Sequence, residues 1–128
     1  MLEPAAAPIR IGISGCLLGE KVRFNGGHKR DRYVDAVLRE HFQLSAFCPE
    51  VAIGMGTPRQ PIRLVGPPSS PRAVGTRDPE REVTGELRAY GRRVGETESE
   101  LCGFILKKGS PSCGLERVRV YNDKGMPQ

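Results

Sequence analysis

The stretch Ile9-Arg10-Ile11-Gly12-Ile13-Ser14-Gly15-Cys16 decides the fold. Its isoleucines alternate with small or polar residues, a pattern typical of a half-buried strand, and the run stops at a cysteine. Residues 42–47 form a second apolar run, which also stops at a cysteine, Cys48. If the two strands are parallel, both cysteines lie at the edge of the sheet where ligands bind in open α/β folds.

Helical patterns separate the predicted strands. One begins after Asp31, a predicted N-cap, and the other after Thr84, also a predicted cap. Their apolar faces comprise Tyr33, Val34, Val37 and Leu38 in the first helix and Leu87, Tyr90, Val94 and Leu101 in the second. Further strands are predicted at residues 103–106 and 118–121. The alternation predicts an α/β fold, a three-layer sandwich with a mainly parallel, Rossmann-like sheet.

The length of 128 residues predicts a single domain. With 38% hydrophobic and 27% charged residues, and no long apolar run, the composition excludes membrane-spanning and fully disordered classes. We expect a flexible N-terminus at 1–8, one domain at 9–122 and a tail at 123–128. Gly, Pro, Ser and Arg dominate residues 54–82, which predicts a long loop excursion with one short strand-like piece at residues 62–65. Because no signal-like segment opens the chain, the predicted compartment is the cytoplasm.

The charge balance points to polar or anionic partners. Lys and Arg number 20 against 15 Asp and Glu, a net charge of +5. The basic residues are spread along the chain, whereas nucleic-acid binders usually concentrate theirs on one face. A small anionic molecule or a nucleotide therefore fits the balance as well as a nucleic acid does.

Four cysteines stand at positions 16, 48, 102 and 113, with no Cys-x-x-Cys pair. Cys16, Cys48 and Cys113 each follow a predicted strand, so parallel strands bring all three to one edge. Cys102 precedes the third strand and is expected at the opposite edge. Three thiolates favour an iron–sulfur cluster or zinc, and buried structural thiols remain the third interpretation. A zinc site needs a fourth ligand, for which the candidates are His28 and His41.

Six motifs carry a resemblance to a known family. In order they are Ile13-Ser14-Gly15-Cys16-Leu17-Leu18-Gly19, Val22-Arg23-Phe24-Asn25-Gly26-Gly27, Cys48-Pro49-Glu50-Val51, Thr57-Pro58-Arg59, Ile105-Leu106-Lys107 and Ser110-Pro111-Ser112-Cys113-Gly114. Over residues 9–122 the chain resembles the thiouracil desulfurase, or desulfidase, family. Residues 27–31 and 112–118 resemble its longer members, which continue into a second domain. The sequence therefore has two interpretations: a longer protein whose C-terminal domain lies beyond Gln128, or an isolated catalytic module. Independently, tRNA is a further candidate partner.

The resemblance implies a non-redox, 4Fe–4S-dependent enzyme. It implies conversion of 2- or 4-thiouracil, or thiouridine, to uracil or uridine with release of hydrosulfide, the substrate being a small thiolated pyrimidine base or nucleoside. Cys16, Cys48 and Cys113 match the family's cluster ligands, which leave one iron open. The family's catalytic acid falls on Glu50, and its motif serines fall on Ser110 and Ser112.

Physical chemistry suggests roles for these residues. A soft thiocarbonyl sulfur favours iron, and Glu50 is placed to activate a water that attacks the carbon. Ser110 or Ser112 is expected to orient the water or the ring. Three cations, Lys107, Arg59 and Arg23, are expected to hold a carbonyl oxygen or a phosphate of the substrate.

Each of these residues also has an ordinary structural interpretation. Glu50 can cap the next turn, the two serines can shape their loop, and Arg59 can be a solvated loop charge. Lys107, placed within a strand, can face solvent. At the level of function, the alternatives are a non-catalytic module for thiolated RNA or metal, and a zinc-stabilised adaptor.

Overall fold

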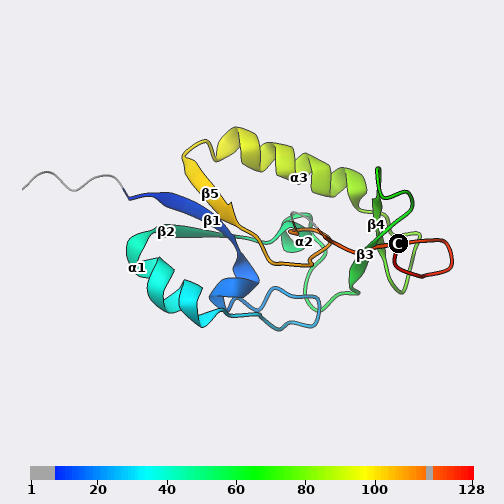
Figure 1. Cartoon of the computed structure of the whole chain (residues 1–128), viewed down its shortest axis with the longest axis horizontal. Coiled ribbons are helices and arrows are strands. Elements are labelled where there is room, and N and C mark those ends of the chain that lie inside the picture. Colours follow the sequence, from blue (N-terminus) through cyan, green and yellow to red (C-terminus); the bar gives the residue numbers. More distant parts are fainter. Residues whose placement is uncertain (1–7, 115–116) are drawn as a thin grey trace, which may run out of the picture.

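A parallel three-stranded sheet forms one end of the computed structural model, which describes residues 8–114 and 117–128 (Figure 1). Its order is β2-β1-β5, with β1 (Arg10–Ser14) between β2 (Gln43–Phe47) and β5 (Leu101–Ile105). Both pairings are parallel, in register from Ile11↔Leu44 to Ser14↔Phe47 on one side. The predicted α/β fold with a parallel sheet is confirmed.

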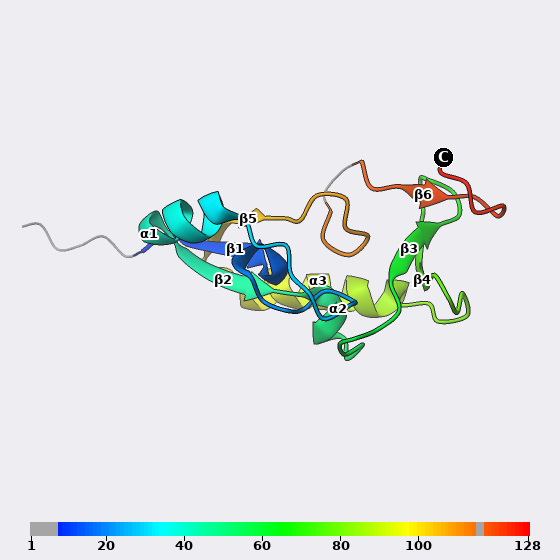
Figure 2. The same ribbon diagram turned by 90° about the horizontal axis from the view of Figure 1, so that it is seen from below.

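Helices cover both faces of this sheet, which makes three layers (Figures 1 and 2). On one face, η2 (Val34–Leu38) leads into α1 (Arg39–His41), and α3 (Thr84–Thr97) lies on the other. Asp31 caps the first helical segment as predicted, because the Val34 N–H donates to its Oδ1 at 3.1 Å.

A second sheet lies beyond the amino end of α3, in order β4-β3-β6 (Figure 2). Strands β3 (Ile62–Val65) and β4 (Arg72–Gly75) pair antiparallel, and β6 (Val120–Tyr121) joins β3 in parallel. The predicted loop at 54–82 therefore contains a strand pair, and the predicted strand at 118–121 is shorter and belongs to this second sheet. The short strand-like piece predicted at residues 62–65 is confirmed as β3, whereas its four-residue partner β4, which lies among Gly and Pro turns, was not predicted.

The segment 54–82 also contributes to the core. Ile62, Ala73 and Val83 form a buried cluster, and Val83 has no exposed surface. Partly buried side chains pack around it: Ile53, Met55, Leu64 and Leu87. Leu87 belongs to α3, so this cluster joins the helix to the second sheet.

Two details of the predicted second helix are wrong. The helix ends at Thr97, and Leu101 opens β5 because its backbone pairs with β1. Thr84 begins the helix without capping it. Instead its Oγ1 accepts a hydrogen bond from the Ala73 N–H at 2.8 Å and ties α3 to β4.

We predict that Thr84→Val lowers the free energy of unfolding by about 1–3 kcal/mol, since it leaves the Ala73 N–H without its acceptor. The matched control is Thr97→Val, at the exposed end of the same helix, for which we expect less than about 0.5 kcal/mol. Denaturant unfolding of the two variants measures both values. Equal losses of unfolding free energy in the two variants would show that the hydrogen bond from the Ala73 N–H to Thr84 stabilises the fold no more than the exposed Thr97 contact does.

Two sequence expectations concern residues outside the described ranges. The flexible N-terminus is predicted at 1–8, of which residues 1–7 are not described. The segment 112–118, which resembles the longer family members, contains residues 115–116, which are also not described. Within the described ranges, no helix has the length and apolar character needed to cross a membrane.

Candidate functional site

Three cysteines lie just beyond the carboxyl ends of the parallel strands. Cys16 is in η1 (Gly15–Leu18), directly after β1, and Cys48 precedes α2 (Pro49–Ala52), directly after β2. Cys113 lies in the turn that follows β5. Cys102 lies inside β5, near its amino end and exposed, so the expectation that it precedes the strand is wrong. Because Cys102 lies near the amino end of β5, it is at the edge of the sheet opposite to the other three cysteines, as predicted.

The Cys16 thiol is buried, and the other two cysteine sulfurs and two cations act on its pKa. Burial raises the pKa of Cys16, and the neighbouring sulfurs of Cys113 and Cys48 raise it further. The charges of Lys107 and Arg23 act in the opposite direction. A metal or cluster that binds Cys16 would therefore displace a proton from its thiol, because thiolate is the ligating form.

The second thiol, Cys48, has its own set of neighbours. Burial also raises the pKa of Cys48, whereas its hydrogen bond with the Val51 backbone and the Arg59 charge lower it. The Cys48 S–H donates to the Val22 carbonyl at 3.8 Å. Cys48 thus contacts the loop that continues from Cys16.

No group of three or more His, Cys, Asp or Glu in residues 8–114 and 117–128 is gathered closely enough to bind one ion. His28, a predicted candidate for a fourth zinc ligand, is exposed, and its Nδ1 accepts a hydrogen bond from the Arg30 N–H at 3.1 Å. His41 is likewise exposed, at the end of α1. Neither histidine thus gives the zinc interpretation a fourth ligand.

Glu50 is fixed by two loops. Pro49 opens α2, where its fixed φ suits a first helical turn, and Glu50 follows it. The Arg59 Nε donates to Glu50 Oε1 at 3.1 Å, and the Ser112 hydroxyl donates to Oε2 at 2.7 Å. The side chains of Arg59 and Glu50 are only 5% and 12% exposed. Arg59 is therefore not a solvated loop charge, and the Glu50 side chain joins the Cys48 and Cys113 segments.

The two motif serines continue this network. The single Ser112 hydroxyl hydrogen goes to Glu50, so the Ser110 hydroxyl donates to Ser112 Oγ across 3.2 Å. Ser110 Oγ in turn accepts the backbone N–H of Cys113 at 3.1 Å. The resulting chain of hydrogen bonds runs from the Cys113 backbone to the Glu50 carboxylate.

A polar hollow of about 220 Å³ lies beside Glu50 and Ser110. Its walls include the cations Arg23 and Lys107 and the ring of Phe24, over which the Arg23 guanidinium stacks at 5.6 Å. Lys107 lies beyond the end of β5 and not within a strand as predicted; its N–H donates to the buried Ser14 Oγ at 2.9 Å. Of the three predicted substrate cations, two therefore face this hollow, and Arg59 is turned inward.

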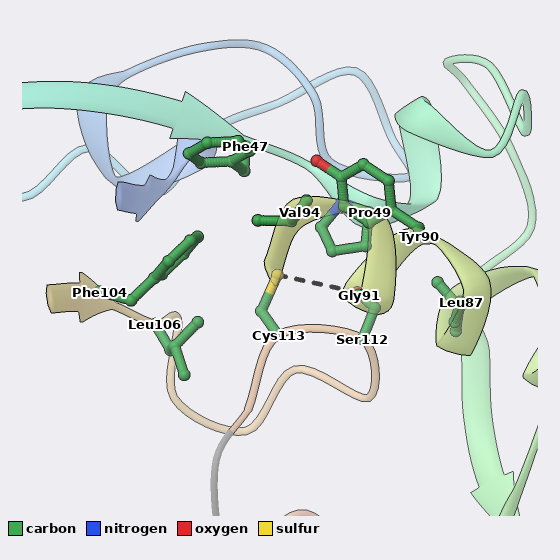
Figure 3. Close-up of a pocket in the computed structure, with 10 residues that line it drawn as sticks. All are labelled: Phe47, Pro49, Leu87, Tyr90, Gly91, Val94, Phe104, Leu106, Ser112 and Cys113. Carbon is green, nitrogen blue, oxygen red and sulfur yellow. Dashed lines mark hydrogen bonds between the residues drawn. The ribbon is translucent and has the colours of Figure 1, made fainter. Parts of the chain in front are cut away.

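An apolar hollow of about 270 Å³ lies on the other side of the Cys113 turn (Figure 3). Figure 3 shows Phe47, Phe104, Tyr90 and Val94 around the Cys113 sulfur, with a 3.9 Å contact from Ser112 Oγ to that sulfur. The Phe47 and Phe104 rings are 5.3 Å apart. Burial and then the Cys48 sulfur raise the pKa of the Tyr90 hydroxyl. This side of the Cys113 turn is therefore apolar and aromatic, in contrast to the charged hollow.

A family model described as 2-thiouracil desulfurase matches residues 11–127, and this range contains every residue of the site. The chain belongs to the 2-thiouracil desulfurase family. Membership agrees with the resemblance carried by the sequence motifs. A solved structure of the 4Fe-4S-dependent thiouracil desulfidase TudS is similar, with a TM-score of 0.67 and 34% identity. That match covers 94% of this chain and 78% of TudS.

A curated relative of this desulfurase-family chain is the uncharacterized protein YbbK of Bacillus subtilis (strain 168). The two are 28% identical over 113 residues, which cover 80% of this chain and 71% of YbbK.

Sequence reasoning missed three parts of this desulfurase-family site. Ser14, which is 2% exposed and links β1 to the segment after β5, appeared as part of a strand and of a motif but without a role of its own. Tyr90 appeared only as a core position of a helix, although it lies by the thiols. The inward role of Arg59 had no local signal at all, because its partners lie 3 to 37 residues away in the chain.

Proposed function

We propose that this chain is a 4Fe–4S-dependent desulfidase that hydrolyses thiolated uracils, 2- or 4-thiouracil or thiouridine, to uracil or uridine and hydrosulfide. The catalytic domain spans residues 9–122. The observation that supports this most is the meeting of three cysteine-bearing segments at one sheet edge. Glu50 bonds the Cys48 segment to the Cys113 turn, and Arg59 bonds Glu50 to Val22 on the loop from Cys16.

The donor set fits a cluster with an open iron. Cys16, Cys48 and Cys113 supply three soft thiolates from separate segments. Ligands on different irons of a cluster need not converge on one point, unlike the ligands of a single ion. When bound, the cluster would offer a Lewis-acidic iron that polarises the C=S bond of the substrate.

The protein's own groups handle the water and the proton. Glu50 uses two of its roughly four lone-pair positions for Arg59 and Ser112, which leaves capacity to accept a proton from water. The Ser110–Ser112 pair holds the carboxylate in place. In the polar hollow, Arg23 and Lys107 are placed to hold a pyrimidine oxygen, and Phe24 offers a ring for stacking.

We predict that Gly114→Ala lowers retention of the cluster roughly 10–100-fold, as loss of a supporting partner does at other metal sites. A Cβ at this position would lie 2.6 Å from the Ser110 carbonyl oxygen and 2.5 Å from Val118, so the turn that carries Cys113 must open. The matched control is Gly95→Ala in α3, where nothing lies within 4 Å. Iron retained against a chelator measures both; equal retention would contradict the role of the turn.

The activity test uses protein purified without oxygen and 2- or 4-thiouracil, with thiouridine in parallel. We expect hydrosulfide and the oxygen-containing base to form in equal amounts. Substrate binding without hydrosulfide would instead support the non-catalytic module. No binding and no turnover by protein that carries its cluster would contradict the proposal.

A further inference from the structure

Arg59 donates hydrogen bonds to several segments of the site from a nearly buried position. The guanidinium donates through Nη2 to the Val22 carbonyl at 2.7 Å, through Nη1 to the Gly56 carbonyl at 2.8 Å, and through Nε to Glu50. Its backbone N–H donates to the Phe24 carbonyl at 2.6 Å. One residue thus satisfies acceptors from three separate stretches of chain.

Two of these acceptors, Val22 and Glu50, connect Arg59 to the cysteine segments. Val22 lies on the loop from Cys16, which is fixed to η1 by the Glu20 N–H on the Gly15 carbonyl at 3.2 Å. The same Val22 carbonyl accepts the Cys48 S–H at 3.8 Å, so it lies between two of the thiols.

Glu50 carries the connection to the third thiol. It stands two residues after Cys48 on α2, and its other oxygen accepts the Ser112 hydroxyl, next to Cys113. The path from Arg59 through Glu50 therefore ends on the Cys113 turn.

We propose that Arg59 is a positioning residue that holds the three cysteine segments in place before the cluster binds; this inference rests on the proposed function. The chemistry of the side chain suits the role. A guanidinium presents several N–H donors in a rigid plane, whereas the lysine ammonium is a compact charge on a flexible stem. At 5% exposure, Arg59 has little contact with water and none of these donors points to the polar hollow.

The test compares Arg59→Met and Arg59→Lys with the unaltered protein after anaerobic reconstitution with iron and sulfide. We expect Arg59→Met to retain at least about tenfold less iron against a chelator, within the range for supporting groups at metal sites. Arg59→Lys is expected to recover part of the lost iron retention, because lysine restores the positive charge but not the several N–H donors of the planar guanidinium. Unchanged iron retention in Arg59→Met would overturn the inference.

Two controls separate positioning from a general loss of stability. Thr84→Val destabilises the fold at the contact between α3 and β4, and Arg72→Met removes an exposed arginine that pairs with Glu82; both are expected to keep their iron. If Thr84→Val loses as much iron as Arg59→Met, the inference fails.

A double variant isolates the carbonyl contacts. Arg59→Met with Glu50→Gln removes both buried charges, so it relieves the unpaired carboxylate but still removes the guanidinium hydrogen bonds to the Val22 and Gly56 carbonyls. We expect its iron retention to remain low, and full recovery would overturn the inference in favour of simple charge neutralisation. Failure of the unaltered protein to take up a cluster would instead count against the proposed function, which keeps the two failures distinct.

Discussion

Serine at position 16, 48 or 113 is expected to abolish stable cluster binding, whereas Cys102→Ser keeps it. Each of the three substitutions removes a thiolate from the carboxyl edge of the sheet. We expect iron content to fall by at least about tenfold, since even the loss of a group that only supports the ligands lowers metal affinity roughly 10–100-fold. Iron and sulfide analysis of anaerobically reconstituted variants measures the effect.

Cys102→Ser serves as the matched control because it makes the same chemical change on the same sheet. Cys102 is exposed in β5, on the amino side of the strand. Equal iron loss in all four variants would mean that serine substitution harms the fold in general. Retained iron in a variant of Cys16, Cys48 or Cys113 would remove that residue from the ligand set.

Glu50→Gln is expected to lower kcat by about 10²–10⁴-fold while the cluster remains, the range for loss of a general base. Glutamine keeps the shape of the side chain and an oxygen that accepts from Ser112 or Arg59, but it cannot take a proton. The variant will also lose stability, since Arg59 then stands in a nearly dry site without its countercharge. Rates are therefore measured per cluster, at a temperature where the variant is folded.

The control for this variant is Glu86→Gln, which neutralises an exposed glutamate that pairs with Arg81 on the surface. We expect its kcat to match the unaltered protein. Full activity per cluster in Glu50→Gln would exclude Glu50 as the base and leave it a structural link between two loops.

The sheet and the cysteine edge followed from local patterns. Strands β1 and β2 were predictable because their apolar residues alternate and each run ends at a cysteine. Parallel order then required only that helices intervene. The position of Cys113 followed from the strand before it, although that strand begins two residues earlier than expected, at Leu101.

The remainder depended on contacts between distant segments. The apolar run of β3 was recognisable at residues 62–65, but β4 gains its stability from pairing with β3 and from the buried Ala73, which composition alone does not reveal. Leu101 continued the helical spacing by coincidence, and its pairing with Arg10 decided its structure. The burial of Arg59 could not be predicted because its acceptors are mostly backbone carbonyls, which any residue type can supply.

The central claim is that three thiols of this chain hold a cluster whose fourth iron is open. Its most direct test is the iron and acid-labile sulfide content of the unaltered protein prepared without oxygen. We predict a coloured protein with about four irons and about four sulfides per chain, the composition of a 4Fe–4S cluster. A colourless protein that binds a single zinc and no sulfide would contradict the claim.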